Sequence, residues 1–501
     1  MHRPSPIENR LAAELAEARP ELAGRYAAEL PGARAAVLTR LWRALAYEPL
    51  PWVTRRVRGA HSLALWQADG RALHGPRADP YATDAYVTAV RLDGVAYDDP
   101  AQLMTELGWP HADGFAAELG HSVASLALSR ADREIPSKEW PDHDWEWEQR
   151  VVDGHPFHPN CRSRPGFSAA DQLAYGPEHR PLVRLETVPA AAGECLLAGD
   201  WPDELRDTGR LLIPVHPWQR AHVLKGGSAG PWRDAHPLMS LRTLALADGP
   251  HVKTALSARL TSSVRDISAY SVGAAMTLSS FATDLASRTD GLLHITRTLG
   301  AVTAGSPDLA ALLRESPQVY AAPGERVLPV AALAGTELPA SPSWLAGFTR
   351  LALTVGLRLL DLGVALEAHG QNLLVVLSAT GDPLRLVYRD LADIRLSPAR
   401  LARHGITPPE LTGRLVTDDE PALRRKLFGS LVAGALAGTA GSGPALATAL
   451  EAAVPHLPGT PDLTALLEGP LPAKALTLMR LSPQVPGDQW TALPNPLAAL
   501  R

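Results

Sequence analysis

Four short clusters of polar residues could carry chemistry in this chain, and the first contains two histidines. It is the run Gly-His-Pro-Phe-His-Pro at residues 154–159, followed by Arg162 and Arg164. Each proline restricts the preceding residue to extended backbone, so His155 and His158 lie on a stiff, non-helical segment. Such histidines can simply bond the backbone or bind a metal ion. The adjacent arginines favour an anion as the partner of this segment.

The second cluster is the run Ile-Pro-Val-His-Pro-Trp-Gln at residues 213–219, directly after an apolar segment. A His-Pro pair shapes a turn, and a tryptophan packs against neighbouring apolar groups. We therefore predict a scaffold role first and a substrate-binding role second.

In the third cluster, His251–Arg265, polar and apolar residues alternate. Polar or cationic residues such as Lys253, Ser263 and Arg265 occupy odd positions. If one strand continues through the segment, its period of two lines these groups along one side of a sheet. Charge-assisted hydrogen bonds, each worth about 1.5–3 kcal/mol, suit a triphosphate. The alternative is a solvated sheet face.

The fourth cluster is Glu-Ala-His-Gly-Gln-Asn at residues 367–372, followed by two β-like runs and Arg389-Asp390. Mg²⁺ prefers oxygen ligands, with one or two of them carboxylates. Glu367, Asn372 and Asp390 could therefore hold Mg²⁺ against phosphate oxygens. Burying these polar groups between two apolar runs would otherwise be costly.

The elements that must position these clusters predict an α+β chain of three parts. Residues 1–150 are expected to form a mostly helical lobe, because apolar residues recur there at near-helical spacing. Residues 151–320 contain short apolar runs separated by Gly, Pro and Asp, which favour an antiparallel sheet. Residues 321–501 are expected to be mostly helical, with one hairpin after the fourth cluster.

Particular segments are predicted within these parts. Met239–Leu246 and Val252–Leu260 are expected to be strands, and Gly300–Ser343 a loop-rich crossing. Trp344–Leu362 is expected to be an apolar helix that ends at Gly363.

Composition narrows the function classes. The net charge is −5 and the pI is about 6.4, without a long Lys/Arg run, so no nucleic-acid footprint is expected. The two cysteines are too few for a disulfide framework or an iron–sulfur site and fit a reducing, cytoplasmic compartment. No leader and no apolar run of about 18 residues is evident, so neither export nor membrane spanning is expected.

Six motifs in this order resemble the NRPS-independent siderophore synthetases of the IucA/IucC type. They are HPxHP, PVHPWQ, TSSxR, EaHGQN, RD and the late run Lys474–Leu481. The resemblance covers about residues 151–481, and residues 1–150 share only helical character. It implies a cupped-hand architecture with a helical thumb, β-rich fingers and a mostly helical palm.

The resemblance also implies the reaction. A carboxylate is converted by ATP to an acyl-adenylate with release of pyrophosphate, and an amine or hydroxyl then displaces AMP to give an amide or ester. Citrate or a citrate derivative is the favoured acid, and 2-oxoglutarate or a succinylated polyamine is the alternative. The implied cofactors are ATP and Mg²⁺, and the implied assembly is a homodimer.

Carried over by motif, the resemblance assigns each site residue a role. The predicted catalytic residues are His158, Arg265 and His369. The predicted ATP-binding residues are His158, Arg162, Ser262, Ser263, Arg265, Gln371, Asn372 and Asp390. The predicted substrate-binding residues are His155, His369, Gln371 and Arg389. The predicted metal ligands are Glu367, Asn372 and Asp390.

Several positions depart from the family pattern or leave alternatives open. Arg162 stands where the family often has Lys, so a planar fork replaces a point charge. Arg389 could instead form a structural ion pair, and Arg288 and Arg297 are possible substrate contacts. A small-molecule phosphotransferase is the mechanistic neighbour, but Gln371 stands where its Asp would. A ferric-siderophore reductase would need more cysteines.

Overall fold

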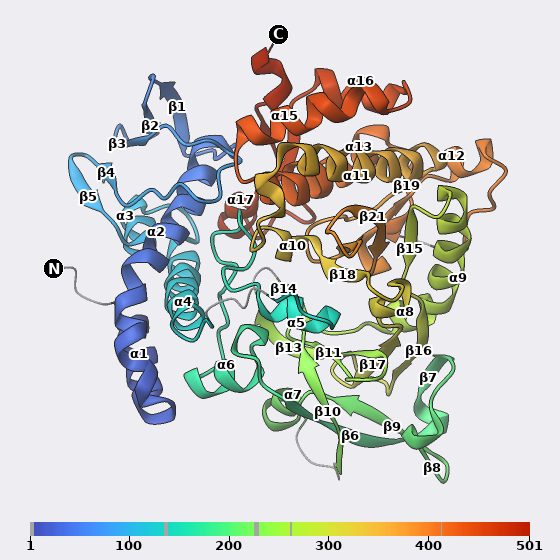
Figure 1. Ribbon diagram of the computed structural model, residues 1–501. Helices are drawn as coiled ribbons and strands as arrows, with labels where there is room; N and C mark the ends of the chain where they lie inside the picture. Colours follow the sequence, from blue (N-terminus) through green and yellow to red (C-terminus); the bar gives the residue numbers. More distant parts are fainter. Residues whose placement is uncertain (1–4, 135–138, 225–229, 261–262, 412, 501) are drawn as a thin grey trace.

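The computed structural model describes residues 5–134, 139–224, 230–260, 263–411 and 413–500 (Figure 1). It combines helices with largely antiparallel sheets, so the predicted α+β class is confirmed. The division at residues 150 and 320 remains a proposal. Among the described residues, no helix is both long and apolar enough to cross a membrane.

The N-terminal part, blue in Figure 1, packs four helices beside a five-stranded sheet in the order β1-β2-β3-β4-β5. The helices are α1 (Pro6–Ala18), α2 (Ala23–Tyr47), α3 (Pro100–Leu107) and α4 (Ala112–Ala131). The strands are β1 (Val53–Arg58), β2 (Ser62–Gln67), β3 (Ala72–Pro76), β4 (Val90–Leu92) and β5 (Val95–Tyr97). A capping box of Ser5 and Glu8 starts α1.

The middle part is built on a nine-stranded sheet in which each neighbouring pair is antiparallel, in the order β7-β16-β17-β12-β11-β10-β6-β9-β8. Its strands are β6 (Val183–Ala191), β7 (Leu196–Gly199), β8 (Arg206–Asp207), β9 (Arg210–Val215), β10 (Gly230–Pro237), β11 (Thr243–Ala245), β12 (His251–Thr254), β16 (Thr298–Thr303) and β17 (Ala310–Arg314). The prediction of a loop-rich crossing from Gly300 to Ser343 was therefore wrong, since β16, β17, β18 (Arg326–Pro329) and α10 (Val330–Leu333) lie there.

Two predicted strands are shorter or broken. Met239–Leu246 is extended only at β11, because residues 238–242 form a turn. Val252–Leu260 splits into β12 and β13 (Leu256–Leu260), and β13 pairs with β14 (Ser263–Arg265) in a separate sheet. The expectation of one polar face through this segment was wrong, because its two halves belong to different sheets.

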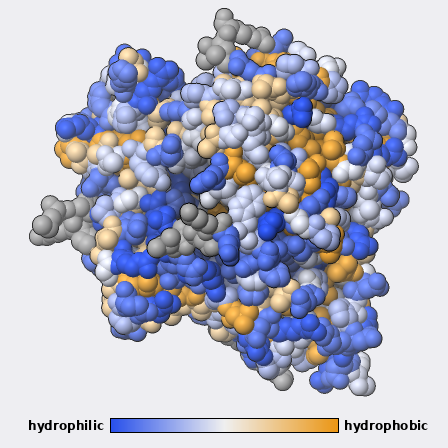
Figure 2. Space-filling view, in the orientation of Figure 1, coloured by the Kyte–Doolittle hydropathy of each residue, from blue (hydrophilic) through white to orange (hydrophobic). Residues whose placement is uncertain are grey.

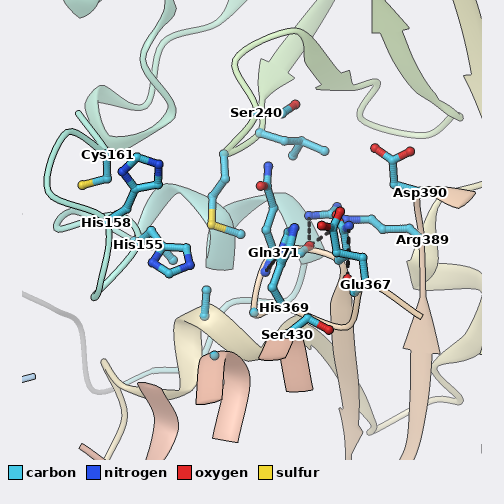
Figure 3. A pocket seen from close by; sticks show the side chains of 18 of the residues that line it. His155, His158, Cys161, Ser240, Glu367, His369, Gln371, Arg389, Asp390 and Ser430 are labelled. Carbon is cyan, nitrogen blue, oxygen red and sulfur yellow. Dashed lines mark hydrogen bonds between the residues drawn. The ribbon is translucent and has the colours of Figure 1, made fainter. Parts of the chain in front are cut away.

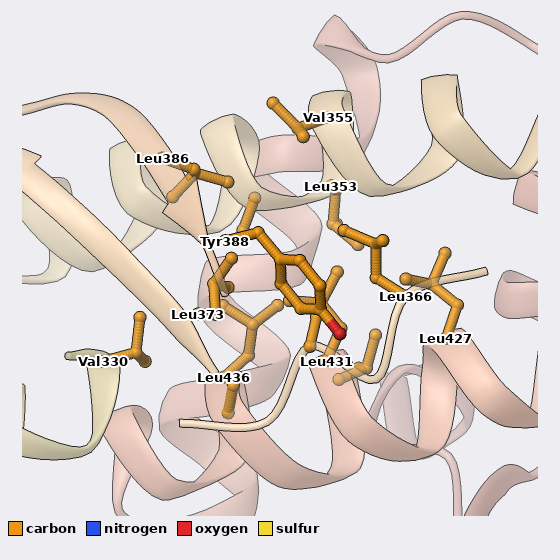
Figure 4. Packing of buried hydrophobic residues seen from close by; sticks show 14 of the residues in the cluster. Val330, Leu353, Val355, Leu366, Leu373, Leu386, Tyr388, Leu427, Leu431 and Leu436 are labelled. Atoms are coloured by element: carbon orange, nitrogen blue, oxygen red, sulfur yellow. The ribbon is translucent and has the colours of Figure 1, made fainter. Parts of the chain in front are cut away.

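A four-stranded sheet, β15-β21-β20-β18, packs against α11 (Pro342–Leu362), and all its strands except β15 come from the last part. The strands are β15 (Leu293–Ile295), β18 (Arg326–Pro329), β20 (Leu373–Leu377) and β21 (Pro383–Tyr388). The helix ends at Gly363, whose φ is 105°, and this confirms the predicted cap. Tyr388 is fully buried among leucines of α11, β20 and the C-terminal helices (Figure 4).

The C-terminal helices, orange and red in Figure 1, complete this core. They are α12 (Pro398–Arg403), α13 (Glu420–Leu427), a π-helix (Phe428–Leu436), α14 (Ala437–Ala440), α15 (Gly443–Ala453), α16 (Pro461–Glu468) and α17 (Leu476–Leu481). The strands β23 (Leu471–Lys474) and β24 (Trp490–Leu493) form a hairpin around α17. Buried residues of α17 pack into the core of the N-terminal part, so the end of the chain joins the first part to the last.

Candidate functional site

Residues of the first, third and fourth clusters line one cavity of about 1670 Å³, to which all three parts contribute. In Figure 3, His155 and His158 lie at the left, His369 and Gln371 near the centre, and Glu367 and Asp390 towards the right. The face in Figure 2 is mostly hydrophilic and is hollowed between the N-terminal part and the rest. A cavity of this size exceeds the usual 300–1,000 Å³ of a single-ligand pocket. It can therefore hold two substrates together.

Residues 367–372 form a tight loop between β19 (Val364–Ala365) and β20. Nδ1 of His369 accepts a hydrogen bond from the Gln371 amide at 3.2 Å. Burial lowers the pKa of His369, so the ring is neutral at neutral pH and carries its proton on Nε2. A Cβ at Gly370 would lie 3.0 Å from the Ala331 nitrogen. The glycine therefore lets the loop approach α10 (Val330–Leu333).

Glu367 is held by two lysines. Nζ of Lys426 and Nζ of Lys474 both lie 2.9 Å from its Oε1. Although burial opposes it, the pKa of Glu367 falls below its usual range because of Lys474, His369 and Lys426. This arrangement does not support the predicted metal role of Glu367, since ammonium groups already neutralise the carboxylate.

Asp390 stands inside a cluster of four cations, which we call the cation cluster: Arg242, Lys253, Arg265 and Arg314. Lys253 Nζ lies 2.8 Å from Oδ2 of Asp390, and Arg314 Nη2 lies 3.7 Å from Oδ1. Despite its burial, the pKa of Asp390 is lowered by Lys253, Arg314 and Arg242. One carboxylate among four cations leaves a surplus of positive charge, which fits a polyanion.

The residues at Glu367 and Asp390 do not fit a resident Mg²⁺ ion. Both carboxylates are in contact with lysines, and the Asn372 amide lies 3.5 Å from the carbonyl oxygen of Glu367. No group of three or more His, Cys, Asp or Glu side chains could hold a metal ion in the described ranges. Asp390 has a φ of 73°, a left-handed backbone that costs energy outside glycine and recurs at functional sites.

Arg389 forms the structural ion pair that the sequence left open. Its Nη1 lies 2.6 Å from Oε1 of Glu148, and both side chains are almost fully buried. Its Nε and Nη2 donate to the Gln371 carbonyl at 3.1 and 2.9 Å. Arg389 therefore holds the loop that carries Gln371, and its guanidinium is committed to protein partners.

The His-Pro segment brings His155 and His158 to the cavity wall. Burial lowers the pKa of His158 to about 3, and Arg40 and Arg265 act in the same direction. The ring is therefore neutral at physiological pH, and it can donate or accept a hydrogen bond without adding charge.

Arg162 and Arg164 hold the His-Pro segment in place through contacts with other parts of the protein. Arg162 lies 3.2 Å from Glu178 and donates to the carbonyls of Val151 and Val152 at 2.6 and 2.5 Å. Arg164 contacts the same buried Glu178 at 2.8 Å. The predicted phosphate role of Arg162 is not supported, because its guanidinium is engaged with these groups.

The second cluster is a scaffold, as predicted. His216 caps α7 (Pro217–His222), and its Nδ1 accepts a hydrogen bond from the Trp218 amide. Gln219 is fully buried and forms two hydrogen bonds with Ser257 of β13. Its Oε1 accepts a hydrogen bond from the Ser257 amide at 2.7 Å, and its Nε2 donates to Oγ of Ser257 at 2.9 Å. This bonding fixes the strand that leads towards Arg265.

The remaining predicted residues divide by location. Arg265 lines the cavity, whereas Ser262 lies outside the described residues. Ser263 is the first residue of β14. Arg297 forms an exposed ion pair with Glu315 at 2.7 Å and is not part of the cavity wall, nor is Arg288. The structure therefore gives no support to the possibility that these two arginines contact substrate.

Sequence reasoning missed several charged residues that the fold brings to the cavity. They are Arg40, Arg242, Arg314, Lys426 and Asp393, and Glu148 contacts the wall through Arg389. They lie in segments without a motif. Lys253, in the alternating run, and Lys474, in the last motif, also line the cavity and carried a sequence signal, but they were not among the predicted site residues.

Two family models match consecutive segments of the chain. Residues 143–335 match the IucA / IucC family, and residues 342–443 match the ferric iron reductase FhuF-like transporter family. Neither Cys161 nor Cys195 lies in the second segment. The predicted resemblance to IucA/IucC-type synthetases is confirmed.

Characterised relatives point the same way. The chain is 25% identical over 345 residues to a citryl-spermidine/3,4-dihydroxybenzoyl-citryl-spermidine:spermidine ligase of Bacillus anthracis, and the match covers 56% of each protein. It is 23% identical over 374 residues to staphyloferrin A synthase of Staphylococcus aureus, covering 60% of this chain and 63% of the relative. The chain thus spans little more than half the length of these relatives.

Solved structures match over nearly the whole chain. The petrobactin biosynthesis protein AsbB of Bacillus anthracis superposes with a TM-score of 0.78 at 19% identity, covering 99% of this chain and 98% of that one. The ATP-bound aerobactin synthetase IucA of Klebsiella pneumoniae superposes with a TM-score of 0.71 at 20% identity, covering 93% of this chain and 99% of that one. The chain therefore has the fold of these synthetases.

Proposed function

From this fold and the match to the IucA / IucC family, we propose that the chain is an ATP-dependent ligase of siderophore synthesis. It activates a carboxylate as an acyl-adenylate and transfers the acyl group to an amine or hydroxyl. The observation that carries the proposal is the cation cluster around Asp390, in the same cavity as His158 and the His369 loop. The ATP-bound relative of the same fold supports ATP as the polyanion.

The proposed reaction has two steps. The substrate carboxylate attacks the α-phosphorus of ATP, and the bond to the β-phosphate oxygen breaks with release of pyrophosphate. An amine or hydroxyl then attacks the acyl carbon, loses its proton, and displaces AMP. Adenylation removes the negative charge that repels nucleophiles and replaces oxide with a better leaving group.

The chain's contribution is mainly electrostatic. Arg242, Lys253, Arg265 and Arg314 stabilise the charge that grows on the departing pyrophosphate, because preorganised cations act strongly in a site shielded from water. Neutral His158 and the Nε2–H of His369 serve as hydrogen-bond donors towards the carboxylate and the α-phosphate. Holding both substrates in one cavity supplies the proximity that the first step needs.

Citrate or a citrate derivative is the proposed acid, because the names of the relatives include a citryl-spermidine ligase and a D-ornithine–citrate ligase. An acid built on 2-oxoglutarate or a succinylated polyamine is the alternative. We further propose a homodimer that acts in the reducing cytosol. Magnesium enters as part of the MgATP substrate, since the lysines at Glu367 and Asp390 leave no site for a resident ion.

The nucleotide product tests the reaction type. Purified protein is incubated with MgATP, hydroxylamine and a panel of citrate, citrate monoamides, 2-oxoglutarate and succinylated amines. AMP, pyrophosphate and a hydroxamate are expected with at least one acid. ADP as the nucleotide product would indicate a phosphotransferase instead, and no product with any acid would count against the proposal.

A further inference from the structure

Glu148, on the short helix α5 (Asp144–Gln149), contacts both walls of the cavity. On the palm side its Oε1 lies 2.6 Å from Nη1 of Arg389, which donates to the Gln371 carbonyl. On the fingers side its Oε2 accepts a hydrogen bond from the Met239 amide at 2.8 Å. One buried carboxylate thus joins the Gln371 loop to the turn at residues 238–242, which ends in Arg242 of the cation cluster.

The same helix has a second contact with the nine-stranded sheet, one helical turn earlier. Oδ2 of Asp144 lies 3.0 Å from Nε2 of His251 on β12, and both side chains are buried. Residues four apart lie on one face of a helix, so Asp144 and Glu148 point the same way. Trp145, between them, stacks on His236 of β10 with ring centroids 3.5 Å apart. The helix is therefore anchored to the sheet while Glu148 reaches the palm.

We propose that Glu148 is a positioning residue of the adenylation site: it sets the separation between the substrate-facing Gln371 loop and the Arg242 turn. The inference rests on the proposed function. A carboxylate can hold two walls at a fixed separation only if each of its oxygens contacts one of them. Here Oε1 contacts Arg389 on one wall, and Oε2 accepts a hydrogen bond from Met239 on the other. A displacement of about 1 Å between reacting groups can cost up to 10²-fold in rate, so this separation matters for catalysis.

The decisive variant is Glu148→Asp, which keeps the negative charge that Arg389 needs but is one methylene too short to contact both partners. We expect kcat for adenylate formation to fall at least tenfold, while the melting temperature stays within a few degrees of wild type. Glu148→Gln leaves a buried arginine uncompensated and should also unfold more easily.

The matched control is Glu325→Asp. It shortens another Glu–Arg pair, with Arg385 of β21, outside the cavity wall, and should leave kcat within twofold.

Hydrogen exchange supplies a readout that does not depend on activity. In Glu148→Asp, the amides of residues 238–242 and 367–372 should exchange at least tenfold faster than in wild type, and those near Glu325 should not change. Unchanged exchange at both segments together with wild-type kcat would overturn the positioning role. If wild-type protein forms no AMP with any acid, the proposed function fails, but the exchange experiment still decides the role of Glu148.

Discussion

Arg265 contributes a guanidinium to the cavity that forms no ion pair with the described residues. Burial lowers the pKa of Arg265, although Asp390 and Glu367 act in the opposite direction. Its removal therefore leaves no buried partner uncompensated. We predict that Arg265→Ala weakens ATP binding by about 10- to 100-fold, the value of one charge-assisted contact of about 1.5–3 kcal/mol, without loss of stability.

Calorimetric titration with ATP and thermal unfolding measure the two effects separately. Arg297→Ala is the control, because this arginine pairs with Glu315 on the exposed side of the same part of the chain. Wild-type affinity in Arg265→Ala would remove Arg265 from the proposed phosphate site.

Lys253 makes ATP binding depend on pH. Burial lowers its pKa to about 7 from 10.5, although Asp390 opposes the shift. Between these values the unfolded chain holds a proton that the native chain has released, so this group makes stability rise with pH in that window. Its charge, however, is present below pH 7 and is lost above it.

We therefore predict that ATP affinity falls as the pH rises from 6 to 8.5, by up to about tenfold for the loss of one charge-assisted contact. Lys253→Arg keeps its charge and should show a flatter profile. Calorimetry at both pH values measures the two dissociation constants. ATP itself titrates in this range, so the comparison is between proteins at the same pH, and equal ratios in both would contradict the prediction.

The π-helix Phe428–Leu436 forms part of the cavity wall with its small residues Gly429, Ser430, Ala433 and Gly434. A Cβ at Gly429 would lie 2.8 Å from the Trp490 ring and 3.3 Å from the Pro472 carbonyl oxygen. Wide helical turns of this kind are rare and recur at functional sites. The wall depends on the absence of a side chain at this position.

Gly429→Ala should therefore displace Trp490, lower stability by about 1–3 kcal/mol and reduce adenylate formation. Gly347→Ala in α11 is the matched control, because nothing lies within 4 Å of its added methyl group and alanine favours a helix. Denaturant unfolding and the pyrophosphate assay measure both effects. A Gly429→Ala protein as stable and active as wild type would show that the wall adapts to the methyl group.

Elements with local signals could be predicted from the sequence. The helix Pro342–Leu362 follows from its apolar spacing and Gly363, and the hairpin of β20 and β21 follows from two β-rich runs around a turn. The π-helix gave no such signal, because its register depends on packing against Trp490 and β23. The break between β12 and β13 also depends on tertiary pairing, since each half has a different partner strand.

At the scale of the whole molecule, the cavity collects groups that are distant in sequence. Motifs identified His158, Arg265, His369 and Asp390 as cavity residues, because each lies in one of the short polar clusters of the sequence. They could not identify Arg314 or Glu148, whose place depends on which strands pair and where α5 lies. Nor could motifs show that lysines would form ion pairs with the Glu367 carboxylate, since Lys426 and Lys474 lie 59 and 107 residues from it in sequence.

Glu48 joins the N-terminal part to the segment that carries one wall of this cavity. Its buried carboxylate, at the end of α2, accepts hydrogen bonds from the amides of Thr477 and Leu478 at 3.1 and 2.7 Å. These amides begin α17, and Lys474, just before it, contacts Glu367 in the cavity. Glu48 thus helps to hold one cavity wall in place from a different part of the chain.

Burial raises the pKa of Glu48 to about 7 from 4.5, although the two amides oppose the shift. Between these values the native chain holds a proton that the unfolded chain has lost, so this stabilisation is present at low pH and is lost as the pH rises through 7. At about 1.4 kcal/mol per pH unit, the contribution falls by about 2 to 3 kcal/mol between pH 5 and pH 7.

Glu48→Gln cannot titrate and should lack this slope, whereas Glu106→Gln, exposed on α3, should retain it. Denaturation midpoints at pH 5, 6 and 7 measure the difference, and parallel profiles for wild type and Glu48→Gln would show that Glu48 stays ionised in the native protein.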